Sequence, residues 1–333
     1  MKHLFFFASL VFLMGGWISC KKNNSDRDKP SPAKSGDAGS ATVRMIPPGD
    51  KDRVLVPSNN DQSPAIPADL EELVELLGQP TRIPMRQIFD SIKSYGNQAL
   101  SRLLKALSDA NHMVRLNTVK VLGEMKEFAS DIAPHLIALL EKEPIVQVRS
   151  MTIDAMARLE LFTEEARAAY LKAMSDEGWL VRWEAVRAAG KFGQKATSFV
   201  PHLEKKLQDQ SNWVQLYAAI ALIRIQGSSE IASKHLATLT GDSDLRFRLN
   251  LVGQIDELPV ASCPQATDAL LKLLVDPAPK VRRATALAMV RCAPELPRTA
   301  RIEEVLKKAG EDQDYSVRTH AAKALELLKP ATP

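Results

Sequence analysis

The residues best suited to bind a metal or move a proton are the histidines, and three of them recur at one place in the sequence. His135, His202 and His235 each precede a leucine at the predicted start of a helix. Zinc sites use spacings such as H-E-x-x-H or C-x-x-C, and neither occurs here. G-x-S-x-G, the P-loop and G-x-G-x-x-G are also missing. The recurrence therefore predicts a structural position, and the sequence predicts no metal, no cofactor and no enzyme activity.

Two of the three cysteines lie around one predicted helical hairpin. Cys263 comes just before its first helix and Cys292 lies at the end of its second. In an antiparallel hairpin these two ends are neighbours, and exported proteins fold in an oxidising compartment. We therefore predict a disulfide between them, with two separate small core residues as the alternative.

The third cysteine ends an N-terminal targeting segment, residues 1–20. A short basic start is followed by an apolar run, Leu4–Trp17, that is too short for a mature transmembrane helix. The run ends in Ser19 and Cys20, which resembles the lipobox of bacterial lipoproteins; an ordinary secretory signal is the alternative. The resemblance implies a lipid on Cys20. Lys21 follows in place of the aspartate that retains such proteins in the inner membrane, which implies the outer membrane, facing the periplasm.

Residues 21–67 separate this signal from the rest of the chain. They are rich in Pro, Ser and Gly, carry both acidic and basic residues, and show no regular spacing of apolar residues. Such a segment cannot bury enough surface to offset its chain entropy, so it is predicted to be a flexible tether with a reach of roughly 35–40 Å. The repeat domain is predicted to span residues 68–329.

Within that domain one pattern recurs seven times: an acid, and six residues later an arginine (glutamine in one copy) that usually follows valine. The arginine positions are 34, 33, 33, 33, 34 and 36 residues apart. In chain order the pairs are Asp109 and Arg115, Glu143 and Arg149, Asp176 and Arg182, Asp209 and Gln215, Asp242 and Arg248, Asp276 and Arg282, and Asp312 and Arg318. A degenerate earlier copy, Leu73–Gly96, lacks the acid and is the expected N-terminal cap. Such a period predicts a solenoid.

Each copy contains two amphipathic helices, and neither can bury its apolar face within one hairpin. Neighbouring hairpins must therefore stack into an all-α fold, a right-handed α-solenoid of about eight hairpins. Small residues form one column of the second helix and are expected to let adjacent helices approach closely: Ala155, Ala188, Ala221, Ala288 and Ala324. The acid is expected to accept backbone N–H bonds in the turn, and the arginine to reach the acid of the next copy.

The acid, the Val-Arg pair and the Ala-rich second helices resemble HEAT repeats, particularly the short bacterial class known from phycobilin lyases. The resemblance covers about Leu70 to Leu328 and implies that the second helices line the concave side. It does not imply lyase chemistry, because fold does not determine function.

A partner-binding site is predicted where the middle copies combine aromatic and arginine side chains, as interface centres do. Its residues are Trp183, Arg187, Trp213, Tyr217 and Arg224. The alternative is that the tryptophans only fill spaces between helices.

The leading functional hypothesis is a non-enzymatic, lipid-tethered scaffold that binds a protein or peptide in the cell envelope. One alternative is nucleic-acid binding in a basic concave groove. It is not favoured, because the formal net charge of +4 is small for 333 residues and acids interrupt the basic row. A phycobilin-lyase-like enzyme is the other alternative, and the missing chemistry opposes it. No small-molecule substrate is implied.

Overall fold

In the computed structural model, residues 59–333 form the second of the two units into which the chain divides. The structure describes residues 65–258 and 264–328, which all lie in the second unit. The predicted signal peptide, Cys20 and the tether up to residue 64 lie outside the described residues, so they stay predictions. Within the described ranges, no helix is both long enough and apolar enough to cross a bilayer.

The described residues fold into helices joined by short turns, without a β-strand. The helices are α2 (Leu70–Glu75), α3 (Met85–Lys93), α4 (Asn97–Ala106), α5 (His112–Leu122), α6 (Ala129–Lys142), α7 (Val146–Arg158), α8 (Glu164–Ala173), α9 (Trp179–Phe192), α10 (Val200–Lys206), α11 (Asn212–Gln226), α12 (Glu230–Thr238), α13 (Leu245–Asp256), α14 (Pro264–Leu273), α15 (Pro279–Cys292), α16 (Ala300–Ala309) and α17 (Tyr315–Leu327). From α4 onward they pair into seven hairpins, as the repeats predict.

Residues with short polar side chains occupy the N-cap position of several of these helices. Each accepts a hydrogen bond from a backbone N–H of the first turn that has no partner within the helix. The residues that do so include Asn111 before α5, Thr163 before α8, Ser229 before α12, Asp244 before α13 and Asp314 before α17. Each hairpin is therefore defined locally, while its stability comes from its neighbours.

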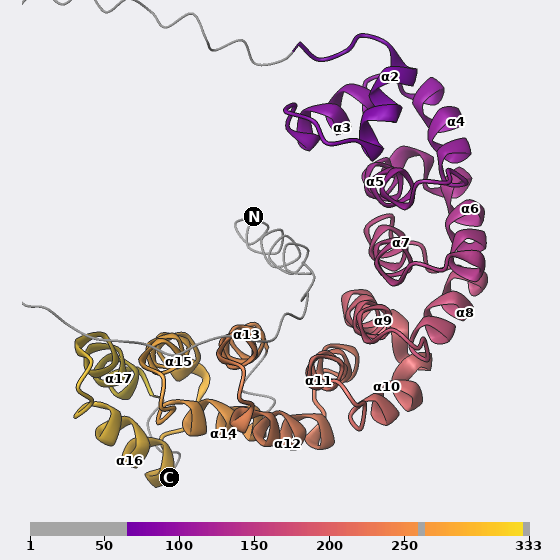
Figure 1. Cartoon of the computed structure of the whole chain (residues 1–333). Coiled ribbons are helices and arrows are strands. Elements are labelled where there is room, and N and C mark those ends of the chain that lie inside the picture. Colours follow the sequence, from indigo (N-terminus) through magenta and orange to yellow (C-terminus); the bar gives the residue numbers. More distant parts are fainter. Residues whose placement is uncertain (1–64, 259–263, 329–333) are drawn as a thin grey trace, which may run out of the picture. The chain divides into compact units, whose positions relative to one another are not determined.

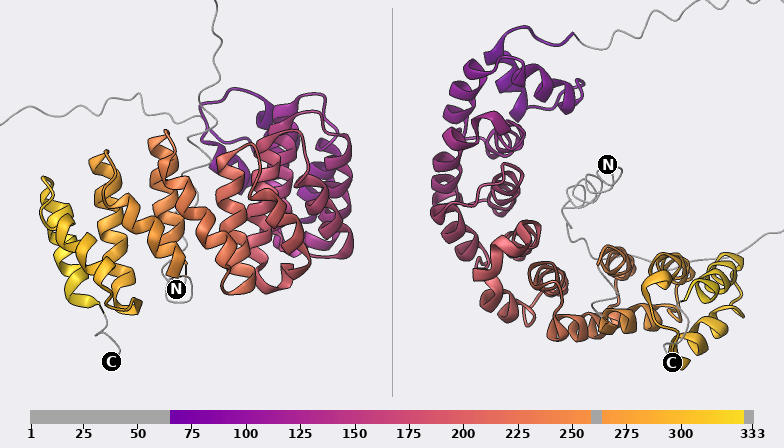
Figure 2. Two further views of the ribbon diagram at one scale, coloured as in Figure 1. Left: turned by 90° about the horizontal axis from the view of Figure 1, so that it is seen from below. Right: turned by 180° about the vertical axis from the view of Figure 1, so that it is seen from behind.

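The helices of the second unit form two rows along an arc (Figure 1). The first helix of each hairpin, α4 to α16, lies in the outer row, and the second helix, α5 to α17, lies in the inner row. The view from behind shows the same two rows (Figure 2). The expected α-solenoid is confirmed, with its second helices on the concave side.

The predicted column of small residues lies where inner helices meet. All five alanines of the column are buried. A Cβ atom on Gly123 would lie 2.9 Å from the Cβ of Ala155, and one on Gly190 would lie 3.1 Å from the Cα of Ala221. The helices approach so closely that even a methyl group lacks room at these glycines.

The acid of every copy shapes the turn that follows it. Its carboxylate accepts the backbone N–H of the residue two positions later, at 2.7 to 3.0 Å, as an Asx-type turn does. The expected role of the acid in the turn is confirmed in all seven copies.

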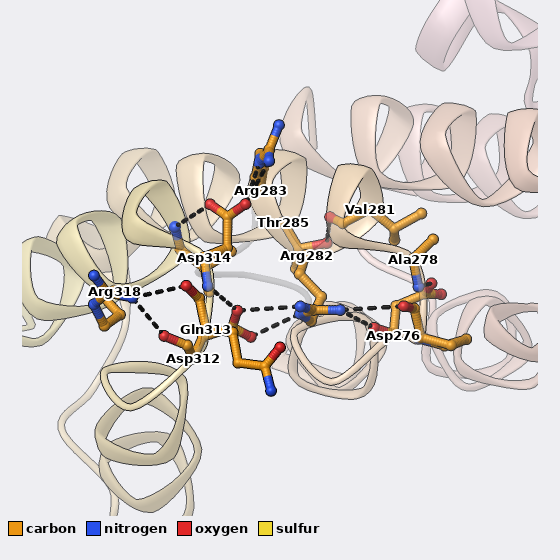
Figure 3. Close-up of polar contacts among 12 residues, drawn as sticks. Asp276, Ala278, Val281, Arg282, Arg283, Thr285, Asp312, Gln313, Asp314 and Arg318 are labelled. Carbon is orange, nitrogen blue, oxygen red and sulfur yellow. Dashed lines mark hydrogen bonds and ion pairs between the residues drawn. The ribbon is translucent and has the colours of Figure 1, made fainter. Parts of the chain in front are cut away.

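Five arginines join consecutive hairpins into what we call the Arg–acid ladder. Each donates Nε–H and Nη2–H to the two carboxylate oxygens of the next acid, and Nη1–H to two carbonyls of its own turn. Figure 3 shows one of them, Arg282, between Asp276 and Asp312. The rungs are Arg115–Glu143, Arg149–Asp176, Arg182–Asp209, Arg248–Asp276 and Arg282–Asp312, at 2.7 to 3.1 Å.

The side chains of the ladder are largely shielded from water, so the pairing arginine strongly affects the pKa of an acid such as Asp209. Burial alone would raise the pKa of the Asp209 carboxyl. The hydrogen bonds from Arg182 and from the Ser211 N–H, together with the charge of Arg182, outweigh burial and hold that pKa below its ordinary value. The rung is thus charged and bidentate, the strongest kind of side-chain pairing.

The three recurrent histidines do not share the place predicted for them. His202 lies near the start of α10, but His135 and His235 lie well inside α6 and α12. For His135 the predicted helix start was wrong, because α6 begins earlier, at Ala129, and includes Pro134. A proline is tolerated this close to the first turn of a helix.

Candidate partner-binding surface

The five residues predicted to contact a partner lie on two adjacent inner helices, α9 and α11. Trp183 of α9 and Tyr217 of α11 stack edge to face, with ring centroids 5.3 Å apart. Their exposed fractions are only 8% and 4%. The two rings therefore pack between the helices, and neither is open to a partner in this structure.

Arg187 completes this cluster from the middle of α9. Its guanidinium lies 5.8 Å from the Trp183 ring centroid, and its Nη2 lies 2.6 Å from Oδ1 of Asp154 on α7. Arg187 also pairs with Glu184 one turn earlier in α9. Burial raises the pKa of the Glu184 carboxyl to about 7, although Arg187 acts to lower it. The cluster links α7, α9 and α11 beneath the inner surface.

Trp213 and Arg224 lie at the two ends of α11 and both contact α13. The Trp213 ring stacks edge to face on Phe247, at 5.1 Å between centroids. Arg224 Nη2 lies 2.8 Å from Oε2 of Glu257, just after α13. Of the five predicted residues, Arg224 is the one engaged only by a partly exposed ion pair.

Ion pairs continue along the inner row toward the N-terminal end. Glu124, at the end of α5, accepts from Arg86 at 2.9 Å and from Lys93 at 2.6 Å. Arg158 of α7 lies 4.0 Å from Glu124 and 2.7 Å from Asp154. These cations are neutralised by acids of the same surface, so they do not form the basic track that nucleic-acid binding requires.

The inner surface changes character in the C-terminal hairpins. Leu287 of α15 is 40% exposed, and the neighbouring concave positions carry small residues, Gly253 on α13 and Ala284 on α15. Arg291 pairs with Asp256 at 2.8 Å beside them. Leu287 was not among the predicted site residues. The sequence feature that could have identified Leu287 is its position five residues after the ladder arginine. Most other copies carry a charged residue at that position, whereas Leu287 is apolar.

No group of three or more metal-binding side chains gathers within the described ranges.

The Cys292 thiol is buried, which raises its pKa to about 12 and makes it a poor nucleophile. Cys263 lies outside the described residues, so the Cys263–Cys292 disulfide stays a prediction.

Two open hollows lie beside the fourth hairpin, formed by α10 and α11. The first is lined by Gln194, Thr197, Val200, Pro201, Ile225 and Gln226. The second is lined by Glu177, Trp179, Arg182, Gln210 and Ser211. The first holds no charged residue, and in the second Arg182 belongs to the ladder while Glu177 lies 3.4 Å from Nη2 of Arg149.

Comparison with known proteins agrees with this architecture. Residues 133–224 match the family model of HEAT repeats. The fold is a HEAT-like α-solenoid. The crystal structure of Escherichia coli YibA superposes with a TM-score of 0.56 at 17% identity, covering 77% of this chain and 92% of that one. No curated protein matches the sequence.

Two further solved structures resemble the chain more distantly. An archaeal HEAT-like repeats protein from Thermococcus onnurineus gives a TM-score of 0.37 at 14% identity, covering 79% of this chain and 98% of that one. The CpcE–CpcF complex of phycocyanin lyase from Nostoc gives 0.45 at 17% identity, covering 81% and 97%.

Proposed function

We propose that this chain is a non-enzymatic scaffold that binds a protein or peptide partner along the inner row of its HEAT-like solenoid. The observation that carries the proposal is the composition of that row. Exposed Leu287 lies among small residues, with the ion pair Arg291–Asp256 beside it. A further ion pair, Arg224–Glu257, lies along the same row between α11 and the end of α13. Apolar centres with polar rims are typical of protein interfaces.

The charge pattern narrows the class of partner. Because most inner cations pair with acids of the same surface, the row carries both signs at short range. A polypeptide with mixed charge and an apolar anchor fits such a surface better than a polyanion. The Trp183–Tyr217 pair supports the surface from beneath, where it keeps α9 and α11 in register.

The test is recovery of the partner by cross-linking in the native envelope, followed by mass spectrometry and pull-down with variants. Leu287→Glu and Lys191→Glu change exposed inner positions. Ile231→Glu and Lys205→Glu make the same chemical changes at exposed positions of the outer helices α12 and α10. We expect the inner pair to lose the partner and the outer pair to retain it. Equal recovery with both pairs would contradict the proposal.

We further propose that a lipid on Cys20 holds the scaffold at the bacterial envelope. The support for this anchor is the lipobox-like sequence that ends at Cys20. Cys20→Ser is expected to move the protein from the membrane fraction to the soluble fraction and to remove the mass of the lipid. Membrane association that survives this substitution would refute the anchor but not the scaffold.

A further inference from the structure

One junction of the solenoid lacks its rung of the Arg–acid ladder. Gln215 of α11 stands where the other copies have arginine. Its Nε2 still donates to the Asp209 carbonyl at 2.6 Å, but its Oε1 meets Nε2 of His235 at 2.9 Å. Asp242, the acid of the next copy, accepts instead from Nδ2 of Asn212 at 2.6 Å. A single amide–carboxylate bond and uncharged hydrogen bonds replace a bidentate ion pair, which is the stronger pairing.

The same junction also breaks the column of small residues. At intact junctions Gly123 faces Ala155 and Gly190 faces Ala221. The equivalent residues here are Ile223 on α11 and Gln254 on α13, and both are large. Two long side chains cannot interlock as a glycine and an alanine do, so α11 and α13 cannot approach as closely.

Gln254 is poorly accommodated at this position. Its exposed fraction is 5%, and its Oε1 finds no hydrogen-bond donor among the described residues. Asn250, one turn earlier in α13, likewise has a buried Oδ1 without a donor there. A buried acceptor without a donor costs about 1–3 kcal/mol, so Gln254 and Asn250 make the packed arrangement of this junction less favourable than apolar residues would.

Side-chain contacts still join the two sides of the junction at several points, including a hydrogen bond between Tyr217 of α11 and Asn250 of α13. Trp213 stacks on Phe247 at one end, Arg224 pairs with Glu257 at the other, and the Gln215–His235 contact joins α11 to the outer helix α12. Gly227, at φ +76°, makes the turn from α11 into α12.

We propose that the junction between α11 and α13 is a hinge. The N-terminal arm, α2 to α11, and the C-terminal arm, α12 to α17, change their relative angle there, pivoting on the outer contact through His235. Hinges are a few positions that absorb a rotation while rigid blocks move. The consequence is that the charged N-terminal part of the inner surface and the Leu287 region adjust separately to what they bind.

The experiment measures distances between pairs of spin labels in the full chain. Labels at Lys191 and Gly253 span one intact junction and the hinge, and labels at Gly253 and Lys323 span two intact junctions. The background carries Cys20→Ser, Cys263→Ser and Cys292→Ala, so that no other cysteine takes a label. All three label sites are exposed. We expect a broader distance distribution across the hinge than across the intact junctions. Equal widths would overturn the proposal.

A repair variant tests whether the named residues cause the extra width. The double substitution Gln215→Arg and Gln254→Ala restores the rung of the ladder and the column of small residues. We expect the distance distribution across the hinge to become as narrow as that across the intact junctions. The matched control, Gln147→Arg with Gln208→Ala, makes the same changes at exposed sites outside the junction and is expected to leave the width unchanged. A hinge that stays broad after repair would show that these residues do not create it.

A reciprocal variant covers the case in which the repaired protein does not fold. Arg182→Gln removes a rung at the intact junction between α9 and α11. Labels on α7 and α11 are expected to show a broader distribution in this variant than in the parent protein. An unchanged width there would also contradict the proposal, since the missing rung is one of its two causes.

Discussion

The junction between α9 and α11 and the junction between α11 and α13 join equivalent helices of consecutive repeats, yet they are built differently. At the first, Arg182 reaches Asp209 and Gly190 meets Ala221. At the second, Gln215 and Gln254 stand at the equivalent ladder and small-residue positions. In a solenoid each repeat depends on its neighbours, so the weakest junction sets where the molecule bends or opens.

The largest expected difference between the two junctions comes from the ladder position. Arg182→Ala removes the bidentate partner of the shielded Asp209 and leaves it only Lys206, whose Nζ lies 3.5 Å away, so we expect it to lower the free energy of unfolding by about 3 kcal/mol. Gln215→Ala removes only uncharged hydrogen bonds and is expected to cost about 1 kcal/mol. Urea unfolding of both variants measures the difference. Equal losses would show that the rung adds nothing.

Two glycines give the next comparison, with opposite signs. Gly190→Ala places a methyl group 3.1 Å from the Cα of Ala221, and we expect this overpacking to destabilise the protein by about 1–3 kcal/mol. Gly253→Ala meets nothing within 4 Å and lies inside α13. It is expected to stabilise the protein by about 0.5–1 kcal/mol, because alanine favours the helix. Thermal unfolding of both variants decides. A destabilising Gly253→Ala would show that this exposed position of α13 has no room for a methyl group.

These differences show how much of the molecule the sequence predicts. The ladder and the small-residue column follow from one local rule repeated along the chain, so period and residue type were sufficient to predict both. The exceptions, Gln215 and Gln254, are visible in the same alignment as breaks in the two columns. Their effect required the structure, because it depends on which columns of adjacent helices face each other.

The candidate site was harder to predict for the same reason. Periodicity places a residue on a helix face only to within part of a turn, and a small rotation moves a side chain from the concave surface into the space between helices. Trp183 and Tyr217 lie in that space, whereas Leu287 is exposed. Long-range ion pairs such as Arg187–Asp154 join residues 33 positions apart, which a helical period alone does not specify.

The charged N-terminal part of the inner surface predicts a pH effect opposite in sign to that of the hinge, where burial lowers the pKa of the His235 imidazole. Because the pKa of Glu184 is raised to about 7, the folded state holds this proton more tightly than the unfolded state does. Its contribution to stability is therefore complete below about pH 4.5 and is lost as the pH rises through 7. We expect a loss of about 2 kcal/mol between pH 5 and pH 8.

The control for this effect is Glu184→Gln, which keeps the shape of the side chain and removes the titration. Unfolding of this variant is expected to depend less on pH between 5 and 8 than unfolding of the parent protein. The equivalent position in α13 is Asn250, which does not titrate. An identical pH dependence in parent and variant would assign the effect to another group.

The smallest expected effect separates the ends of the hinge from its centre. Arg224 and Glu257 are partly exposed, so Arg224→Ala is expected to lower the free energy of unfolding by only about 0.5 kcal/mol, and less at high salt. The same substitution should widen the spin-label distribution across the hinge, because it removes one of the contacts that still join α11 to α13. A contact can therefore matter little for stability and much for the range of angles, since bending opens one weak junction while unfolding must open every packed one. If Arg224→Ala leaves the width unchanged, the restraint on the hinge lies in the remaining side-chain contacts between the two helices and in the outer contact.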